Sequence, residues 1–141
     1  MSSPGKYLPS LEGLNLEFHR RAVETGRLHL QRCADCGVFC HPPRYYCLAC
    51  SSPDRELVPS SERGSVHSFT VSHRTFDPGW AEETPYATVV VELDEGPRVI
   101  GALRGLDPSA LELGRRVRVE VERRGEEFAF LWVEPDSAEA G

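Results

Sequence analysis

The sequence predicts a mainly β chain, in which a short N-terminal helix precedes a cysteine-rich ribbon and a closed barrel of five strands. Three observations lead to this prediction. All five cysteines of the 141-residue chain lie between positions 33 and 50. An apolar period of four residues comes before them. After them come five segments rich in β-branched or alternating apolar residues, separated by turn residues.

The helix is expected to begin at Asn15, because Leu14, Phe18 and Ala22 recur every four residues. An asparagine side chain can accept a hydrogen bond from the free amides of a first helical turn. Gly26 stands where a C-terminal cap belongs, since glycine tolerates the left-handed backbone conformation. A helix of three turns is marginally stable alone, so we expect it to dock on another part of the chain.

The five strands are expected at residues 64–72, 86–93, 98–103, 117–122 and 128–132. The segment 106–114 separates the third strand from the fourth and can hold one helical turn, which is the usual arrangement of an OB-fold. Five strands in about 75 residues favour this small barrel over a seven-stranded sandwich. Trp132 alternates with Phe128 and Phe130, so we expect Trp132 to pack in the core.

Four of the cysteines form two C-x-x-C pairs, Cys33 with Cys36 and Cys47 with Cys50, and ten residues lie between the pairs. Two intervening residues let both sulfurs of a pair face one point. Gly37, directly after Cys36, suits the tight turn this requires. Two such pairs supply four thiolates in a tetrahedron, which is a closed structural site. The spacing therefore predicts one structural Zn²⁺ per chain.

Other interpretations of the cysteines remain open. Iron can bind the same four sulfurs, and spacing does not distinguish the two metals. A disulfide framework does not suit a chain without a recognisable secretory signal, and neither pair has the βαβ context of a redox motif. Cys40 falls outside both pairs and is interpreted as a small, buried apolar residue. His41 beside it is not expected to be a ligand while four spaced cysteines are present.

The order of several short motifs indicates a family. They are Arg32-Cys33-x-x-Cys36-Gly37, Pro42-Pro43-Arg44, Cys47-x-x-Cys50, Pro85-Tyr86 and Leu93-Asp94-Glu95-Gly96. In this order they resemble the DUF35 proteins over roughly residues 14–134. The resemblance implies a rubredoxin-like zinc ribbon followed by an OB-fold. We accordingly expect an N-terminal extension and helix at 1–27, the ribbon at 28–56, the OB-fold at 57–135 and an acidic tail at 136–141.

The resemblance also implies a function. DUF35 proteins are accessory subunits of thiolase-fold enzymes that act on acyl-CoA, including aldolases that cleave steroid side chains. The resemblance thus implies a hetero-oligomer in which this chain is not an enzyme on its own. The chain would stabilise a thiolase-fold partner and help to shape an acyl-CoA site that the two subunits share. No catalytic residue is expected here, because the sequence has no G-x-S-x-G, P-loop or glycine fingerprint.

Two alternatives come from other classes of protein. OB barrels also bind single-stranded nucleic acid, but a net charge of −6 and a pI near 5.4 disfavour phosphate backbones as the partner. A stand-alone acyl-CoA-binding module is the other alternative. The sequence has no apolar run near the roughly 18 residues of a membrane span, and its N-terminus lacks a secretory signal, so we expect a cytoplasmic protein.

Two aromatic segments are candidates for contact with the partner. Tyr45 and Tyr46 lie between the cysteine pairs, and Phe76 and Trp80 lie in the loop between the first two barrel strands. Large aromatic side chains outside regular strands are typical of interface anchors. We therefore predict that these four residues bind the partner. For Phe76 and Trp80 the alternative is that they fold back as a lid on the end of the barrel.

Overall fold

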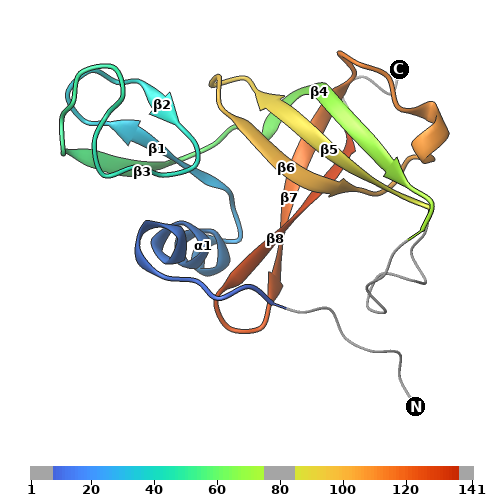
Figure 1. Cartoon of the computed structure of the whole chain (residues 1–141), viewed down its shortest axis with the longest axis horizontal. Coiled ribbons are helices and arrows are strands. Elements are labelled where there is room, and N and C mark those ends of the chain that lie inside the picture. The colour runs from blue at the N-terminus through green and yellow to red at the C-terminus, as the bar shows by residue number, and fades with distance from the viewer. Residues whose placement is uncertain (1–7, 75–84, 137–141) are drawn as a thin grey trace.

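The computed structural model of the chain describes residues 8–74 and 85–136. In order along the chain come one helix, a small three-stranded ribbon and a five-stranded barrel (Figure 1). This confirms the mainly β fold expected from the sequence. In the described part of the chain no helix is long and apolar enough to cross a membrane.

Helix α1 (Gly13–Thr25) begins two residues earlier than expected. Its N-cap is Glu12, whose side chain makes no capping hydrogen bond, so the expectation of an Asn15 cap is wrong. Asn15 instead lies within the first turn. The C-terminal end is as expected: Gly26 has φ 71° in the left-handed region. Because Phe18 and Ala22 are buried, the apolar stripe is the docking face.

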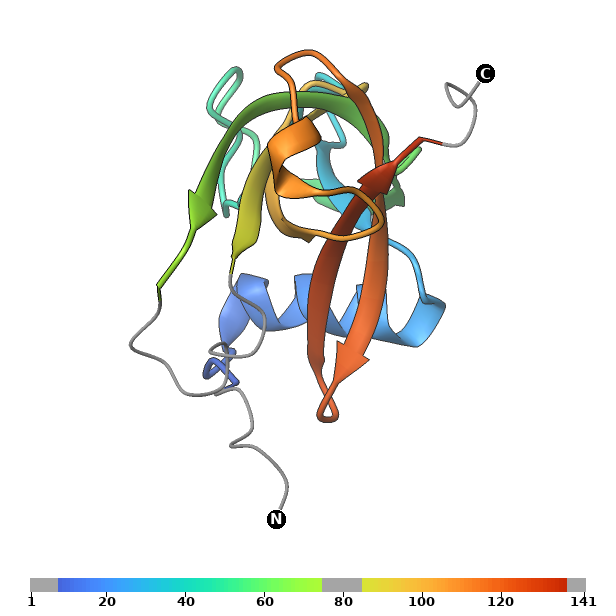
Figure 2. The ribbon, with the colours of Figure 1, turned by 90° about the vertical axis from the view of Figure 1, so that its right-hand side faces the viewer.

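The helix joins the two β units of the molecule. It lies beside the ribbon in Figure 1 and crosses the β7–β8 hairpin of the barrel in Figure 2. His19 Nδ1 accepts a hydrogen bond of 3.1 Å from the Ala129 amide of the barrel, and Arg20 pairs with Glu127 at 2.6 Å. The helix therefore docks on the barrel through polar side chains as well as through its apolar face.

The ribbon is an antiparallel sheet of β1 (His29–Cys33), β2 (Phe39–Cys40) and β3 (Arg55–Pro59), with β1 in the centre. Leu28 and Leu30 are fully buried and pack with Phe18 of α1. Strand β3 spans the 56/57 boundary expected from the sequence, and its pairing with β1 places it in the ribbon sheet.

The barrel consists of β4 (Arg63–Ser72), β5 (Tyr86–Leu93), β6 (Arg98–Leu103), β7 (Arg116–Arg124) and β8 (Phe128–Pro135). Its order is β4-β5-β6-β8-β7, and it closes through parallel pairing of β6 with β8. A Cβ on Gly101 would meet Val133 Cγ2 at 2.8 Å, so glycine allows the two strands to approach. The expected turn between the third and fourth strands is the short 3₁₀ helix η2 (Pro108–Ala110).

The core of the barrel comes from alternating small and β-branched residues, among them Val89, Val91, Val99, Val117 and Val133. On β8 the inward side chains include Ala129 and Val133. The expectation that Trp132 packs in the core is wrong: its ring points away from the side of β8 that carries Ala129 and Val133, as do the rings of Phe128 and Phe130. These rings lie on the outer face, where Arg124 covers Phe130 at 3.7 Å and Arg104 covers Trp132 at 4.9 Å.

A three-residue connection, Ser60 to Glu62, fixes the ribbon to the barrel. Two N–H groups of Arg27 donate to the Ser60 carbonyl at 3.0 and 2.7 Å. The Leu28 amide donates to Glu62 Oε2 at 3.1 Å. Ser60 is fully buried. These contacts leave the connection little freedom, so the metal-binding end of the ribbon is held in one orientation relative to the barrel.

Candidate metal centre

The four cysteines of the two C-x-x-C pairs converge at the end of the ribbon. Their sulfur atoms all lie within 4.8 Å of one another. Cys33 Sγ lies 3.6 Å from Cys50 Sγ, and Cys36 Sγ lies 3.6 Å from Cys47 Sγ. Both separations exceed by far the roughly 2.05 Å of a disulfide bond. Sulfurs around a tetrahedral metal with bonds near 2.3 Å stand about 3.8 Å apart, so the cluster fits a four-sulfur metal site.

Each pair is built on a tight turn that directs amides toward sulfur. In the first turn the Cys36 amide donates to Cys33 Sγ at 3.5 Å, and Gly37 follows with φ 78°. In the second the Ala49 amide donates to Cys47 Sγ at 3.4 Å. Ser51 follows with φ 65°. Ser51 thus occupies the position equivalent to Gly37, in a conformation that a side chain disfavours.

Contacts between the two turns hold the four sulfurs together. The Ser52 hydroxyl donates to the Asp35 carboxylate, and Ser52 Oγ accepts from the Asp54 amide at 3.1 Å. The Ala34 amide donates to the Asp54 carbonyl at 3.0 Å. One turn is therefore hydrogen-bonded to the other by side chain and backbone, which holds the two cysteine pairs against each other.

The electrostatics of the cluster also suit a cation. The Cys36 amide lowers the pKa of Cys33 to about 6, and the amides of Cys50 and Ala49 lower the pKa of Cys47. The Ser52 amide favours the Cys50 thiolate, but the sulfur of Cys33 and burial outweigh it and raise the pKa of Cys50 to about 12. Four thiolates this close repel one another, so all four ionise together once a dication neutralises them.

Cys40 and His41 do not join this cluster. Cys40 Sγ accepts a hydrogen bond from Gln31 Nε2 at 3.2 Å, and burial raises the pKa of its thiol. His41 packs edge-on against Phe18 with ring centroids 4.9 Å apart.

The four residues predicted to contact the partner divide into two groups. Tyr45 and Tyr46 are 59% and 65% exposed, whereas Phe76 and Trp80 lie outside the described residues.

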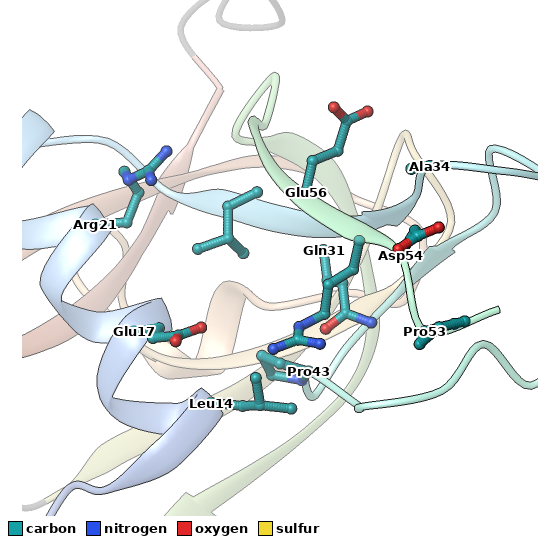
Figure 3. Close-up of a pocket in the computed structure, with 11 residues that line it drawn as sticks. Leu14, Glu17, Arg21, Gln31, Ala34, Pro43, Pro53, Asp54 and Glu56 are labelled. Carbon is teal, nitrogen blue, oxygen red and sulfur yellow. The ribbon is translucent and has the colours of Figure 1, made fainter.

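A polar cleft of about 570 Å³ lies between α1 and the ribbon (Figure 3). Glu17 and Arg21 line it from the helix, and Asp54, Arg55 and Glu56 line it from the ribbon. Its lining contains no Cys, His, Ser or Thr. The side chains that line the cleft are therefore carboxylates, guanidinium groups, one amide and apolar groups.

Both β units of the chain match known domain families. Residues 20–56 match the ChsH2 rubredoxin-like zinc ribbon domain, and residues 57–122 match the ChsH2 C-terminal OB-fold domain. A DUF35 domain-containing scaffold protein from Methanothermobacter thermautotrophicus is 31% identical, in an alignment that covers 68% of this chain and 72% of that protein. The chain belongs to the DUF35 family.

Relatives of this DUF35 chain include a subunit of an enzyme. The 3-oxo-4,17-pregnadiene-20-carboxyl-CoA hydratase alpha subunit of Mycobacterium tuberculosis is 38% identical over 119 residues, which are 84% of this chain. The alignment spans only 37% of that subunit's length. A chain of the solved Ltp2-ChsH2(DUF35) aldolase superimposes with a TM-score of 0.80 and 33% identity, and the match covers 91% of this chain and 98% of that one.

Some features of the DUF35 metal centre were not foreseen from the sequence. The positive φ of Ser51 is one, and the Asp35–Ser52 bridge is another. A signal for the first was present, because Ser51 follows the second cysteine of its pair as Gly37 follows Cys36. No local pattern indicates the second, since the two residues are brought together only when both turns have formed.

Proposed function

We propose that this chain is a non-catalytic accessory subunit of an acyl-CoA enzyme, which binds a thiolase-fold partner, stabilises it and helps to shape the acyl-CoA site. The observation that carries the proposal is the near-complete match to the DUF35 chain of an aldolase assembly at 33% identity. The two β units held rigidly by α1 and the Ser60–Glu62 connection suit a scaffold, because a scaffold must present its contact surfaces in a fixed orientation.

The metal we assign to the four cysteines is one structural Zn²⁺ per chain. Four sulfurs complete a tetrahedral shell, so the ion would keep no open position for a substrate and would supply folding free energy rather than chemistry. Iron is the alternative, and metal analysis of the purified protein distinguishes the two. About one equivalent of zinc is expected, and substoichiometric zinc with abundant iron would contradict the assignment.

The partner surface in this proposal combines Tyr45 and Tyr46 with the Phe76–Trp80 loop. The exposure of both tyrosines supports this assignment, since neither ring is buried in the core. Arg55 lies over the Tyr45 ring at 5.2 Å, which is a cation–π contact at the surface. Aromatic and arginine side chains together are frequent in the energetic centres of interfaces.

Single-stranded nucleic acid is the competing ligand class, because the barrel has the OB topology. The charges of the barrel count against it. Its arginines are largely neutralised by carboxylates: Arg116 pairs with Asp94, Arg124 with Glu122, and Arg104 and Arg118 both with Glu134. We expect a Kd no tighter than the non-specific range of roughly 10⁻⁴ to 10⁻⁶ M at physiological salt.

Co-expression with a thiolase-fold protein encoded in a neighbouring reading frame tests the proposal. The two chains should co-purify as a hetero-oligomer, and the complex should turn over an acyl-CoA thioester. The isolated DUF35 chain should not. Turnover by the isolated chain that a single substitution in it abolishes would make it an enzyme, and submicromolar binding of single-stranded DNA or RNA would favour the competing class.

A further inference from the structure

A patch of exposed apolar side chains surrounds the metal centre on the ribbon. Its members are Val38, Tyr45, Tyr46 and Leu48, which are 46%, 59%, 65% and 78% exposed. They come from both cysteine turns and from the segment between them. Four large apolar side chains on so small a unit exceed the scattered exposure expected of a free surface, which is typical of a surface that another molecule covers.

The patch is hollowed on two sides. One hollow of about 280 Å³ is lined by Phe39, Tyr45 and Leu48, among others, and reaches Arg55 of β3. A second of about 490 Å³ extends from the ribbon to the Glu95-Gly96-Pro97 turn of the barrel. Both share Val38, Phe39, Cys40, Arg44 and Leu48. The two hollows thus adjoin along these shared residues, and together we call them the ribbon groove.

Unpaired positive charge accompanies the ribbon groove. Eight arginines outside the ribbon form ion pairs with carboxylates. Across residues 8–74 and 85–136, the three arginines of the ribbon, Arg32, Arg44 and Arg55, form none. Arg32 instead lies over the Phe39 ring at 5.9 Å and Arg55 over the Tyr45 ring at 5.2 Å.

Arg44 is placed to receive a ligand. Its amide donates to Gln31 Oε1 at 2.9 Å, and Gln31 is 95% buried, so the backbone is anchored while the guanidinium stays exposed. A cation kept free of internal carboxylates beside an apolar groove is complementary to an apolar surface that carries carboxylates. Three arginines on a chain with a net charge of −6 are too few for a nucleic-acid backbone or an anionic membrane.

We propose that the ribbon groove binds a loop of the partner enzyme in which an apolar side chain is flanked by carboxylates. The apolar side chain would occupy the hollow between Phe39, Tyr45 and Leu48, and a carboxylate would pair with Arg44. This inference rests on the proposed function, because it takes the enzyme partner as given and names the chemistry of the contact. It adds Val38, Leu48 and Arg44 to the tyrosines predicted from the sequence.

Charge variants of Arg44 test the electrostatic half of the inference. The affinity of the purified chain for the thiolase-fold subunit is measured by titration calorimetry. Arg44→Glu should weaken it at least about tenfold and Arg44→Gln by less, because reversal adds repulsion to the lost pairing. Raising the ionic strength from about 0.05 to about 0.5 M should weaken the native complex and leave Arg44→Glu little changed. Arg115→Glu is the matched control, since Arg115 is exposed, unpaired and follows η2 on the barrel.

Leucine variants test the apolar half. Leu48→Ser should weaken the complex about tenfold, whereas Leu113→Ser, at a leucine 69% exposed on the barrel, should change it less than about threefold. Metal content and circular dichroism of each variant establish that it is folded. Equal affinities for Leu48→Ser and Leu113→Ser would overturn the inference. So would concentration-dependent dimerisation of the isolated chain that Leu48→Ser abolishes, because a second copy would then cover the groove.

The outcomes separate this inference from the function on which it rests. If the native chain binds the thiolase-fold subunit and the Arg44 and Leu48 variants bind equally well, the ribbon groove is wrong while the accessory role stands. If the native chain binds no thiolase-fold subunit, the accessory role fails and the groove assignment fails with it.

Discussion

At the scale of single residues, the two cysteine turns differ at one position that decides their strain. Gly37 and Ser51 adopt the same left-handed conformation, with φ 78° and 65°. The positive φ costs a non-glycine residue about 1–2 kcal/mol. The second turn keeps this strained conformation because the Ser51 amide donates to the Cys47 carbonyl at 2.8 Å. The turn is thus kept by its hydrogen bonds rather than by its residue type.

Exchanging the residue types should separate the two turns. Gly37→Ala should lower the free energy of unfolding of the metal-loaded protein by about 1–2 kcal/mol, and Ser51→Gly should leave it unchanged or raise it. Denaturant titration measures both. A loss of stability in Ser51→Gly as large as that in Gly37→Ala would mean that the serine side chain makes a stabilising contact that outweighs its strained backbone.

The cysteines themselves give a second prediction at this scale. Cys47→Ser should reduce bound metal from about one equivalent to a small fraction, because a hydroxyl is a poor replacement for one of four thiolates. Cys40→Ser should retain the metal, since its sulfur lies outside the cluster and contacts Gln31. Elemental analysis after gel filtration compares the two variants. Equal metal loss in both would place Cys40 in the coordination shell.

At the scale of elements, the sequence predicted the positions of the strands well, but less well which side chains of each strand point into the barrel. Strands β5 and β6 have the bounds that the β-branched runs indicate. On β8 both sets of alternating residues are apolar, so periodicity alone does not tell which set faces inward. Ala129 and Val133 point into the barrel, because the interior of a five-stranded barrel has room for small side chains. Phe130 and Trp132 are instead covered by Arg124 of β7 and by Arg104, which follows β6.

The start of α1 shows the same limit. Asn15 has the chemistry of a cap, but the helix is extended to Gly13 by a backbone bond from the Leu16 amide to the Glu12 carbonyl at 3.3 Å. The docked face of the helix, with Phe18 buried against the ribbon and the barrel, determines the position of this turn more strongly than one cap residue does. Such tertiary contacts have no local sequence signal.

The junction between α1 and the ribbon should respond to pH through His41. Burial, with His19 nearby, lowers the pKa of His41 from 6.5 to about 4. The unfolded chain therefore takes up this proton at higher pH than the folded chain does. The contribution of the neutral ring to stability is fully present above about pH 6.5 and is lost as the pH falls toward 4, by up to about 3 kcal/mol.

A variant isolates this effect from acid loss of the metal. His41→Phe keeps an aromatic ring against Phe18 but has no proton to bind. Between pH 6.5 and pH 4.5 its free energy of unfolding should fall by less than that of the native chain, by roughly 2 kcal/mol. The metal centre is common to both proteins and cancels in the difference. Parallel pH dependences would show that the pKa of His41 is the same in the folded and the unfolded chain.

At the scale of the whole molecule, the two β units depend on different sources of stability. The barrel has its own closed core of valine, leucine and alanine side chains. The ribbon has strands of five, two and five residues, and few of its side chains are buried. A unit of about 30 residues rarely buries enough apolar surface to fold alone, so the ribbon depends on its metal and on contact with α1.

Removal of the metal should therefore unfold one part of the chain and spare the other. After treatment with a strong chelator, the amides of β1, β2 and β3 should lose protection from hydrogen exchange, while those of β5 and β8 should keep it. The helix should keep part of its protection, because it also packs on β8 and the Ala129 amide still donates to His19. Exchange followed by mass spectrometry resolves these segments in the full chain.

The connection at Ser60 to Glu62 determines how far the loss of protection extends from the ribbon into the barrel. Its bonds to Arg27 and Leu28 join residues that both precede β1, so loss of the ribbon removes the partners that hold the start of β4. Exchange should accordingly spread into the first residues of β4 and stop before the β5 pairing at Phe69 with Val89. Complete loss of protection in β5 and β8 on chelation would instead mean that the two units fold as one, and that the metal stabilises the barrel as well as the ribbon.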